Sequence, residues 1–398
     1  MKNFFFYIII IVFFIATFFI IELKQTNIDL DNSNSEKRAV FLSYIELNKY
    51  VKNKDEKESK QNLIEILDNI YKNKFNMLII HVRPFSDAIY NSTIFPISNN
   101  VKVNGKAPDY DILKFVITEA KKRKIEVHAW INPYRISSNT DISTIDKNSI
   151  AYKMYEEGNA KVVKNKGIFY NPGSKSVTDL IVSGVVELVK NYNIDGIHFD
   201  DYFYPDADID LDTYQKYIED GGTLSLDDYR YNNILNLIKE VNSQIKKVNK
   251  NVLFGISPEG NIENDYKKHY LNISEILSKK DYIDYIMPQI YFGFENTTKP
   301  YIKTIKEWNE LITDKNIKLI PALAFYKSGN TDKYAKDGKD EWINNKNIIT
   351  RQVEEARKLS QYTGFSLFRY DSIFDDVNIN DSNKEELNNL LKILNWIN

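Results

Sequence analysis

The sequence lacks cysteine altogether, and histidine is scarce, with four residues among 398. The missing thiols exclude disulfide bonds, thiolate metal sites, a cysteine nucleophile and lipidation of an N-terminal cysteine. Charge of either sign is not in excess, since the formal net charge is -2 and both signs are spread along the chain. Without a basic stripe or an acidic tail, the composition gives no indication of a nucleic-acid partner.

Several catalytic motifs are missing too. The absence of a G-x-S-x-G elbow argues against a serine triad. His81, His128 and His198 lie near predicted strand ends, but no H-x-H or H-E-x-x-H spacing is present. The sequence therefore favours polar contacts over a metal site, and it implies no cofactor.

One long apolar run, from Phe4 to Ile21, stands at the N-terminus after Lys2. Its length approaches the roughly 20 residues that cross a bilayer, and no A-x-A cleavage site follows it. We expect residues 1–23 to be a membrane signal anchor, with a cleaved signal peptide as the alternative, and residues 24–37 to be a flexible linker. Either interpretation places the rest of the chain outside the cytoplasm, anchored at the extracellular face of the membrane or secreted.

From Arg38 onward, short apolar segments alternate with amphipathic helical segments. The expected strands are residues 38–47, 76–84, 125–135, 194–205, 251–260, 283–294, 316–327 and 363–373. Eight such strand–helix units predict an α/β fold over residues 38–398, a (β/α)8 TIM barrel with long βα loops. A doubly wound open sheet is the alternative, but it would need a Gly-rich turn after its first strand, and none is present.

Polar side chains gather at the predicted C-terminal strand ends, where barrel enzymes have their active sites. Side chains alternate along a strand, so residues two apart share a face. The expected groups are His81 with Arg83; His128, Trp130 and Asn132; His198 with Asp200; Ser257 with Glu259; and Met287, Gln289 and Tyr291. By the same parity Asp201 points away, unless the loop has already turned.

Carboxylates on neighbouring strands suit glycoside hydrolysis, in which one attacks or activates water and the other protonates the leaving oxygen. Asp200 and Glu259 are the strongest candidate pair, and Asp201 is the substitute for Glu259. An acid at Glu259 needs a raised pKa to hold its proton at neutral pH. Structural alternatives stay open, because two aspartates at a strand end are also typical of a turn or a helix cap.

Several blocks of the sequence resemble the glycosyl hydrolase-like 10 family of bacterial surface proteins. They include HVRPFSDAIYNSTIFP, HAWINPYR, GIHFDDYFYP and YIMPQIYFGF, and the matching blocks run from Arg38 to about Phe374. The resemblance implies a (β/α)8 barrel with glycosidase activity on a polysaccharide of the bacterial envelope or exterior. The site residues that it implies are Arg83, Asp87, Asn132, Tyr134, Arg135, Asn171, His198, Asp200, Asp201, Gln289 and Tyr291.

The segment G-I-H-F-D also resembles the G-F-R-x-D of retaining α-amylase-type barrels, whose nucleophile matches Asp200 and whose fifth-strand glutamate falls near Glu259. We therefore expect a retaining hydrolase, with His128, Trp130 and Tyr202 as further residues of the sugar site. Two other functions stay open. One is a non-catalytic glycan-binding barrel at the cell surface, and the other is a deacetylase or amidohydrolase that holds a metal at His81, His128 or His198.

Overall fold

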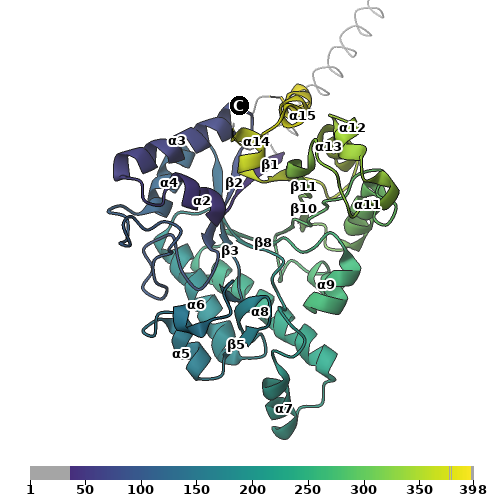
Figure 1. The fold of residues 1–398 in the computed structure, drawn as a ribbon. Coiled ribbons are helices and arrows are strands. Elements are labelled where there is room, and N and C mark those ends of the chain that lie inside the picture. Colours follow the sequence, from purple (N-terminus) through teal and green to yellow (C-terminus); the bar gives the residue numbers. More distant parts are fainter. Residues whose placement is uncertain (1–35, 376, 378, 396–398) are drawn as a thin grey trace, which may run out of the picture.

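A computed structural model describes residues 36–375, 377 and 379–395 (Figure 1). The predicted anchor and most of the predicted linker lie outside these residues. Within the described ranges, no helix is both long enough and apolar enough to span a membrane. The folded part begins slightly earlier than expected, because the carboxylate of Glu36 is buried and accepts hydrogen bonds from Arg38 and Arg357, each at 2.8 Å.

The centre of the molecule is a curled, barrel-like sheet of nine parallel strands in the order β10-β9-β8-β7-β3-β2-β1-β12-β11. Its strands are β1 (Lys37–Leu42), β2 (Met77–Arg83), β3 (Glu126–Ile131), β7 (Gly196–Phe199), β8 (Leu253–Ile256), β9 (Tyr285–Ile286), β10 (Lys318–Leu319), β11 (Ala322–Ala324) and β12 (Gly364–Phe368). The short strands β10 and β11 occupy the seventh predicted strand, with Pro321 between them. Since β10 pairs with β9 and β11 pairs with β12, the sheet curls back on itself and is not a doubly wound open sheet.

Helices surround the sheet (Figure 1). They are α2 (Tyr44–Tyr50), α3 (Glu56–Lys72), α4 (Ile112–Lys122), α5 (Ile150–Glu156), α6 (Lys175–Asn191), α7 (Leu211–Glu219), α8 (Leu226–Val248), α9 (Ile262–His269), α10 (Ile273–Ile276), α11 (Tyr301–Leu311), α12 (Glu341–Asn344), α13 (Ile348–Ala356), α14 (Tyr370–Phe374) and α15 (Asp381–Lys392). Their apolar stripes pack on the outer face of the sheet and form the main core. In α6, for example, Ser174 caps the first turn, and buried residues recur at Val177, Ile181 and Leu188.

The first and third strands are shorter than predicted. The expected strand 38–47 ends at Leu42, because Ser43 and Glu46 form a capping box that starts α2. The expected strand 125–135 ends at Ile131, and Arg135–Ser137 instead forms β4 of a separate antiparallel sheet with β5 (Ala160–Val163) and β6 (Gly167–Tyr170). This small sheet lies in the connection from β3 to α6, where it can wall the barrel mouth.

The inside of the barrel is filled by rings. Phe41 makes edge or tilted contacts with Trp130, His198 and Phe368, at centroid distances of 5.4, 5.5 and 5.6 Å. Below it, the hydroxyl of Tyr285 lies 2.9 Å from Nδ1 of His128 and 3.0 Å from Nδ1 of His198. All of these residues except Phe368 are buried, so the barrel has a packed floor and no open channel.

Gly196 makes room for one of these rings, since a Cβ atom there would lie 2.2 Å from Nδ1 of His128. We predict that Gly196→Ala lowers the free energy of unfolding by about 1–3 kcal/mol through overpacking. Adding His128→Ala should make the double variant less unstable than the sum of the two single changes. Urea unfolding of the three variants measures this coupling, and strictly additive effects would contradict a packing role for His128.

Candidate active site

Asp200 follows the last residue of β7 and stands over the ring-filled interior. Its side chain is buried, and Oδ2 accepts a hydrogen bond from Nε1 of Trp130 at 2.9 Å, while Oδ1 accepts one from the backbone N–H of Tyr202 at 3.3 Å. Burial and the nearby charge of Asp201 raise the pKa of Asp200 to about 7, although Trp130, Arg135 and the Tyr202 amide oppose this shift. Asp200 is therefore a carboxyl group that titrates near neutrality, as catalytic groups require.

Asp201 also faces the mouth, because the chain turns directly after Asp200. Its side chain interacts with Gln289 by a hydrogen bond and with His269 and Glu259 by charge. Burial raises the pKa of Asp201 as well. Strand parity alone would have pointed Asp201 away, so the turn is what brings the two carboxyls into one site, and the charge of one disfavours ionisation of the other.

The site floor comes from the neighbouring strands. Trp130 stacks on His81 with 3.7 Å between ring centroids and 7° between planes, so its N–H is held toward Asp200. Burial holds the pKa of His81 and of His198 well below the usual histidine range. These two histidines are therefore neutral parts of the floor.

Glu259 lies beyond β8, and its surroundings differ from those expected of a proton donor. Its carboxylate accepts a hydrogen bond from Nδ2 of Asn264 at 2.7 Å and lies 3.2 Å from Nε2 of His269. These contacts, the one with His269 above all, lower the pKa of Glu259. The raised pKa that a general acid needs is found at Asp200 and Asp201 and not at Glu259.

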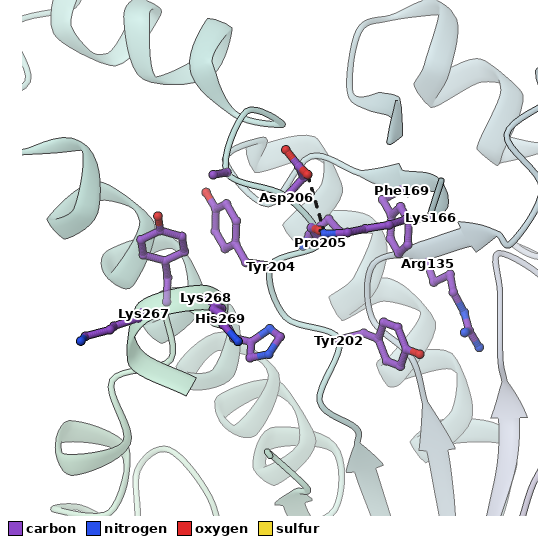
Figure 2. Close-up of a pocket in the computed structure, with 12 residues that line it drawn as sticks. Arg135, Lys166, Phe169, Tyr202, Tyr204, Pro205, Asp206, Lys267, Lys268 and His269 are labelled. Atoms are coloured by element: carbon purple, nitrogen blue, oxygen red, sulfur yellow. Dashed lines mark hydrogen bonds and ion pairs between the residues drawn. The ribbon is translucent and has the colours of Figure 1, made fainter. Parts of the chain in front are cut away.

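A groove of about 580 Å³ opens at Tyr202, which directly follows the two aspartates in the chain (Figure 2). Its walls come from β4, β6, the segment after Asp201 and the end of α9. The lining residues are Arg135, Lys166, Phe169, Tyr202, Tyr204, Pro205, Asp206, Ala207, Lys267, Lys268, His269 and Tyr270. Tyr202 and His269 border both the groove and the carboxylates, so the two form one continuous site.

Comparisons with known proteins place this geometry in a family. The glycosyl hydrolase-like 10 family model matches residues 36–340. The chain belongs to the glycosyl hydrolase-like 10 family. It is 34% identical over 323 residues to "Glycosyl hydrolase YngK" of Bacillus subtilis (strain 168), a match covering 75% of this chain and 62% of that protein. It is 32% identical over 338 residues to "Glycosyl hydrolase DigH" of Escherichia coli (strain K12), covering 78% and 75% respectively.

A solved structure agrees with the fold. The PgaB (BpsB) glycoside hydrolase domain from Bordetella bronchiseptica superposes with a TM-score of 0.55 at 12% identity, covering 86% of this chain and 96% of that domain. At that identity the likeness concerns the barrel-like fold alone.

Three predicted sugar-site residues of this glycosyl hydrolase-like 10 chain, Arg135, Gln289 and Tyr291, lie around the carboxylate pair. The guanidinium of Arg135 lies 4.8 Å from the ring centre of Tyr202 and 4.6 Å from that of Phe85. Gln289 contacts Asp201, and Tyr291 packs near Phe368 and Tyr326. Asn132, two residues after Trp130, has a structural contact instead. Its Oδ1 accepts a hydrogen bond from the backbone N–H of Arg135 at 3.0 Å, which orders the turn that carries Arg135.

Arg83 does not lie in the mouth. A β-bulge lets His81 and Arg83 pair with consecutive residues of β3, which turns Arg83 to the outer face of the sheet. There it is fully buried, with its guanidinium 3.7 Å from the ring centre of Phe95 and directly against Gly184 of α6. The expectation that His81 and Arg83 share a face is therefore wrong.

Other predicted site residues also lie away from the carboxylates. His128 belongs to the lower interior with Tyr285, and Tyr134 is fully buried in the outer core. Asn171 accepts the backbone N–H of Gly173 at 2.9 Å in the turn before α6. Asp87 lines a separate hollow with Ser86 and Pro96, where burial raises its pKa to about 6.

Sequence reasoning missed His269, Lys268, Tyr44 and Phe85. The first two end α9 and carry only the ordinary signal of basic residues in a last helical turn, while Tyr44 and Phe85 follow β1 and β2 and pack edge to face at 5.3 Å. In the described part of the chain, no three histidine, aspartate or glutamate side chains come together as metal ligands would. The interior positions of His81, His128 and His198 are explained by ring packing.

The raised pKa of Asp200 predicts a pH-dependent stability. The unfolded carboxyl titrates near 3.8 and the folded one near 7, so stability falls as pH rises through that window. Asp200→Asn removes the buried charge, and we expect it to raise the free energy of unfolding by about 1–3 kcal/mol at pH 8 but by little at pH 4.

Chemical denaturation at the two pH values measures the difference. Asp208→Asn, at an exposed position of the following loop, is the matched control and should change stability by the same small amount at both. If Asp200→Asn raises the free energy of unfolding equally at pH 4 and pH 8, the gain does not come from removal of a buried charge.

Proposed function

We propose that this chain is a retaining glycoside hydrolase whose catalytic carboxyls are Asp200 and Asp201. The observation that carries the proposal is the pair of adjacent carboxyls, both with raised pKa, at the mouth of a barrel-like fold and beside an aromatic groove. Two such groups, one protonated and one ionised, supply the acid and the nucleophile that glycoside hydrolysis requires. Membership of the glycosyl hydrolase-like 10 family supports the same reaction class.

The hydrogen bonds around the pair divide the roles. Asp200 accepts N–H donors from Trp130 and Tyr202, which favour its ionised form and orient it as the nucleophile. Burial and, to a smaller extent, the ionised Glu259 raise the pKa of Asp201 and favour retention of the proton there, although Gln289 and His269 oppose this shift. Asp201 protonates the leaving oxygen as Asp200 attacks the anomeric carbon, and it then takes a proton from the water that releases the sugar. Arg135 and Gln289 position the sugar around this centre.

Retention is tested by the anomer that first appears. Proton NMR of early hydrolysis should show a product with the anomeric configuration of the substrate. If the first product has the opposite anomeric configuration, water attacks the anomeric carbon directly and Asp200 is not the nucleophile.

The substrate that we propose is a polysaccharide of the bacterial envelope or exterior, reached from the extracellular face of the membrane. The support is the apolar run at residues 4–21, whose length suits a membrane anchor. Protease added to intact cells tests this location, and we expect it to cleave the barrel. If the chain is cleaved only after the cells are lysed, the proposed extracellular location is wrong.

Loss of the nucleophile should abolish hydrolysis. We expect Asp200→Asn to lower kcat by about 10³-fold or more, because the isosteric amide keeps the packing but cannot form the covalent intermediate. Release of reducing ends from cell-wall and capsular glycans measures the loss, and circular dichroism checks the fold. Full activity in this variant would overturn the assignment, whereas wild-type glycan binding without any hydrolysis would favour the non-catalytic alternative.

The choice between Asp201 and Glu259 as acid is tested by paired amides. Asp201→Asn should lower kcat by about 10²–10⁴-fold, the usual loss for a general acid. Glu259→Gln should cost about tenfold or less, since it removes a charge that influences the pKa of Asp201 and disturbs the placement of His269 but removes no reacting group. Substrates with a good leaving group should restore much of the rate to the true acid variant. If a good leaving group restores the rate of Glu259→Gln and not that of Asp201→Asn, Glu259 is the general acid and the proposed assignment is wrong.

A further inference from the structure

Four cationic side chains line the groove, and among the described residues two of them have a carboxylate partner while two do not. Nζ of Lys267 lies 2.7 Å from the carboxylate of Glu263, and Nζ of Lys166 lies 3.7 Å from that of Asp206. In contrast, within the described residues neither Lys268 nor Arg135 has a carboxylate at salt-bridge distance. Figure 2 shows Lys267 extending away from the centre of the groove, while Lys268 and Arg135 stand on its two sides with Tyr202 between them.

These two cations without a carboxylate partner, Lys268 and Arg135, stand next to an acidic centre; Arg135 also donates a hydrogen bond to the carbonyl of Pro84 at 3.2 Å. Asp200, Asp201 and Glu259 together would repel an anionic ligand, unless positive groups next to them offset the repulsion. The positive charge of Arg135 lowers the pKa of Asp200, and that of Lys268 lowers the pKa of Glu259, so both cations act on the carboxylates through space. Both cations therefore lie near enough to Asp200 and Glu259 to offset part of their negative charge.

The groove also offers faces for sugar rings. Tyr202 is 41% exposed, and it presents its ring between the two cations. Tyr270 is half-buried and lines the groove on the α9 side, where its ring is supported by edge contact with the buried ring of Tyr204 at 5.0 Å. Aromatic faces contact the apolar faces of sugars, and lysine and arginine bind carboxylates by charge-assisted hydrogen bonds.

We propose that this groove is a subsite for a sugar that carries a carboxylate, adjacent to the sugar held at Asp200, and thus that the substrate is an acidic polysaccharide. The proposal rests on the proposed function and deepens it. Lys268 and Arg135 bind the carboxylate, Tyr202 supports the ring, and the backbone N–H of Tyr202 connects this subsite to the nucleophile.

Binding to the inactive Asp200→Asn protein tests the subsite separately from catalysis. The probes are oligosaccharides of hyaluronan, alginate and polygalacturonate, each compared with the same chain after its carboxylates are reduced to alcohols. We expect at least one carboxylated probe to bind more tightly than its reduced form. Adding Lys268→Gln should weaken that binding about fivefold and leave the reduced form unaffected.

Lys267→Gln is the matched control. It removes a neighbouring lysine whose charge is already paired with Glu263, and its effect on binding should stay below about twofold. Equal binding of carboxylated and reduced probes, or equal effects of the two lysine variants, would overturn the subsite. Poly(glycerol phosphate) is a further probe, whose negative charge comes from phosphate groups and not from carboxylates. If the protein binds this polymer and none of the carboxylated oligosaccharides, the carboxylate assignment is wrong.

These outcomes are separable from failure of the proposed hydrolysis. Binding is measured on a protein that cannot turn over, so inactivity of the wild-type chain would reject the proposed function without altering the comparison between Lys268 and Lys267.

Discussion

The ring-filled interior of the barrel is the constraint on which the site depends. The space inside the strands below the mouth is occupied by the buried side chains of Phe41, Trp130, His81, His198 and Tyr285. Asp200 stands on this floor, and desolvation is the largest cause of its raised pKa. The same packing fixes the indole of Trp130, so the floor sets both the protonation and the orientation of Asp200.

The polar parts of the site come from connections and not from the strands themselves. The turn after Asp200 brings Asp201 into the mouth, and β4 of the small antiparallel sheet brings Arg135 over Tyr202. The end of α9 brings His269 to Glu259. A rigid sheet with functional loops at its C-terminal edge is the usual division of labour in such folds. At the end of α9, the contact with His269 lowers the pKa of Glu259 and keeps it ionised.

The fold could be predicted further than the site. Each of the eight expected strand positions holds a strand, because an apolar stripe is a local property of the chain. The shortened first strand also had a local signal, the capping box of Ser43 and Glu46. The outward position of Arg83 had no such local signal. The bulge that turns Arg83 outward depends on pairing with β3, and its packing against Gly184 depends on α6.

The sequence by itself determined the succession of buried strands and amphipathic helices, the absence of thiol chemistry, and the placement of two aspartates at the end of the fourth strand. These follow from residue type and spacing along the chain. Only the tertiary structure decided that both aspartates face the mouth and that Glu259 is ionised. A pKa depends on desolvation and on neighbouring charges, and here the neighbours of Asp200 and Asp201, namely Trp130, Arg135, Gln289 and His269, come from distant parts of the sequence.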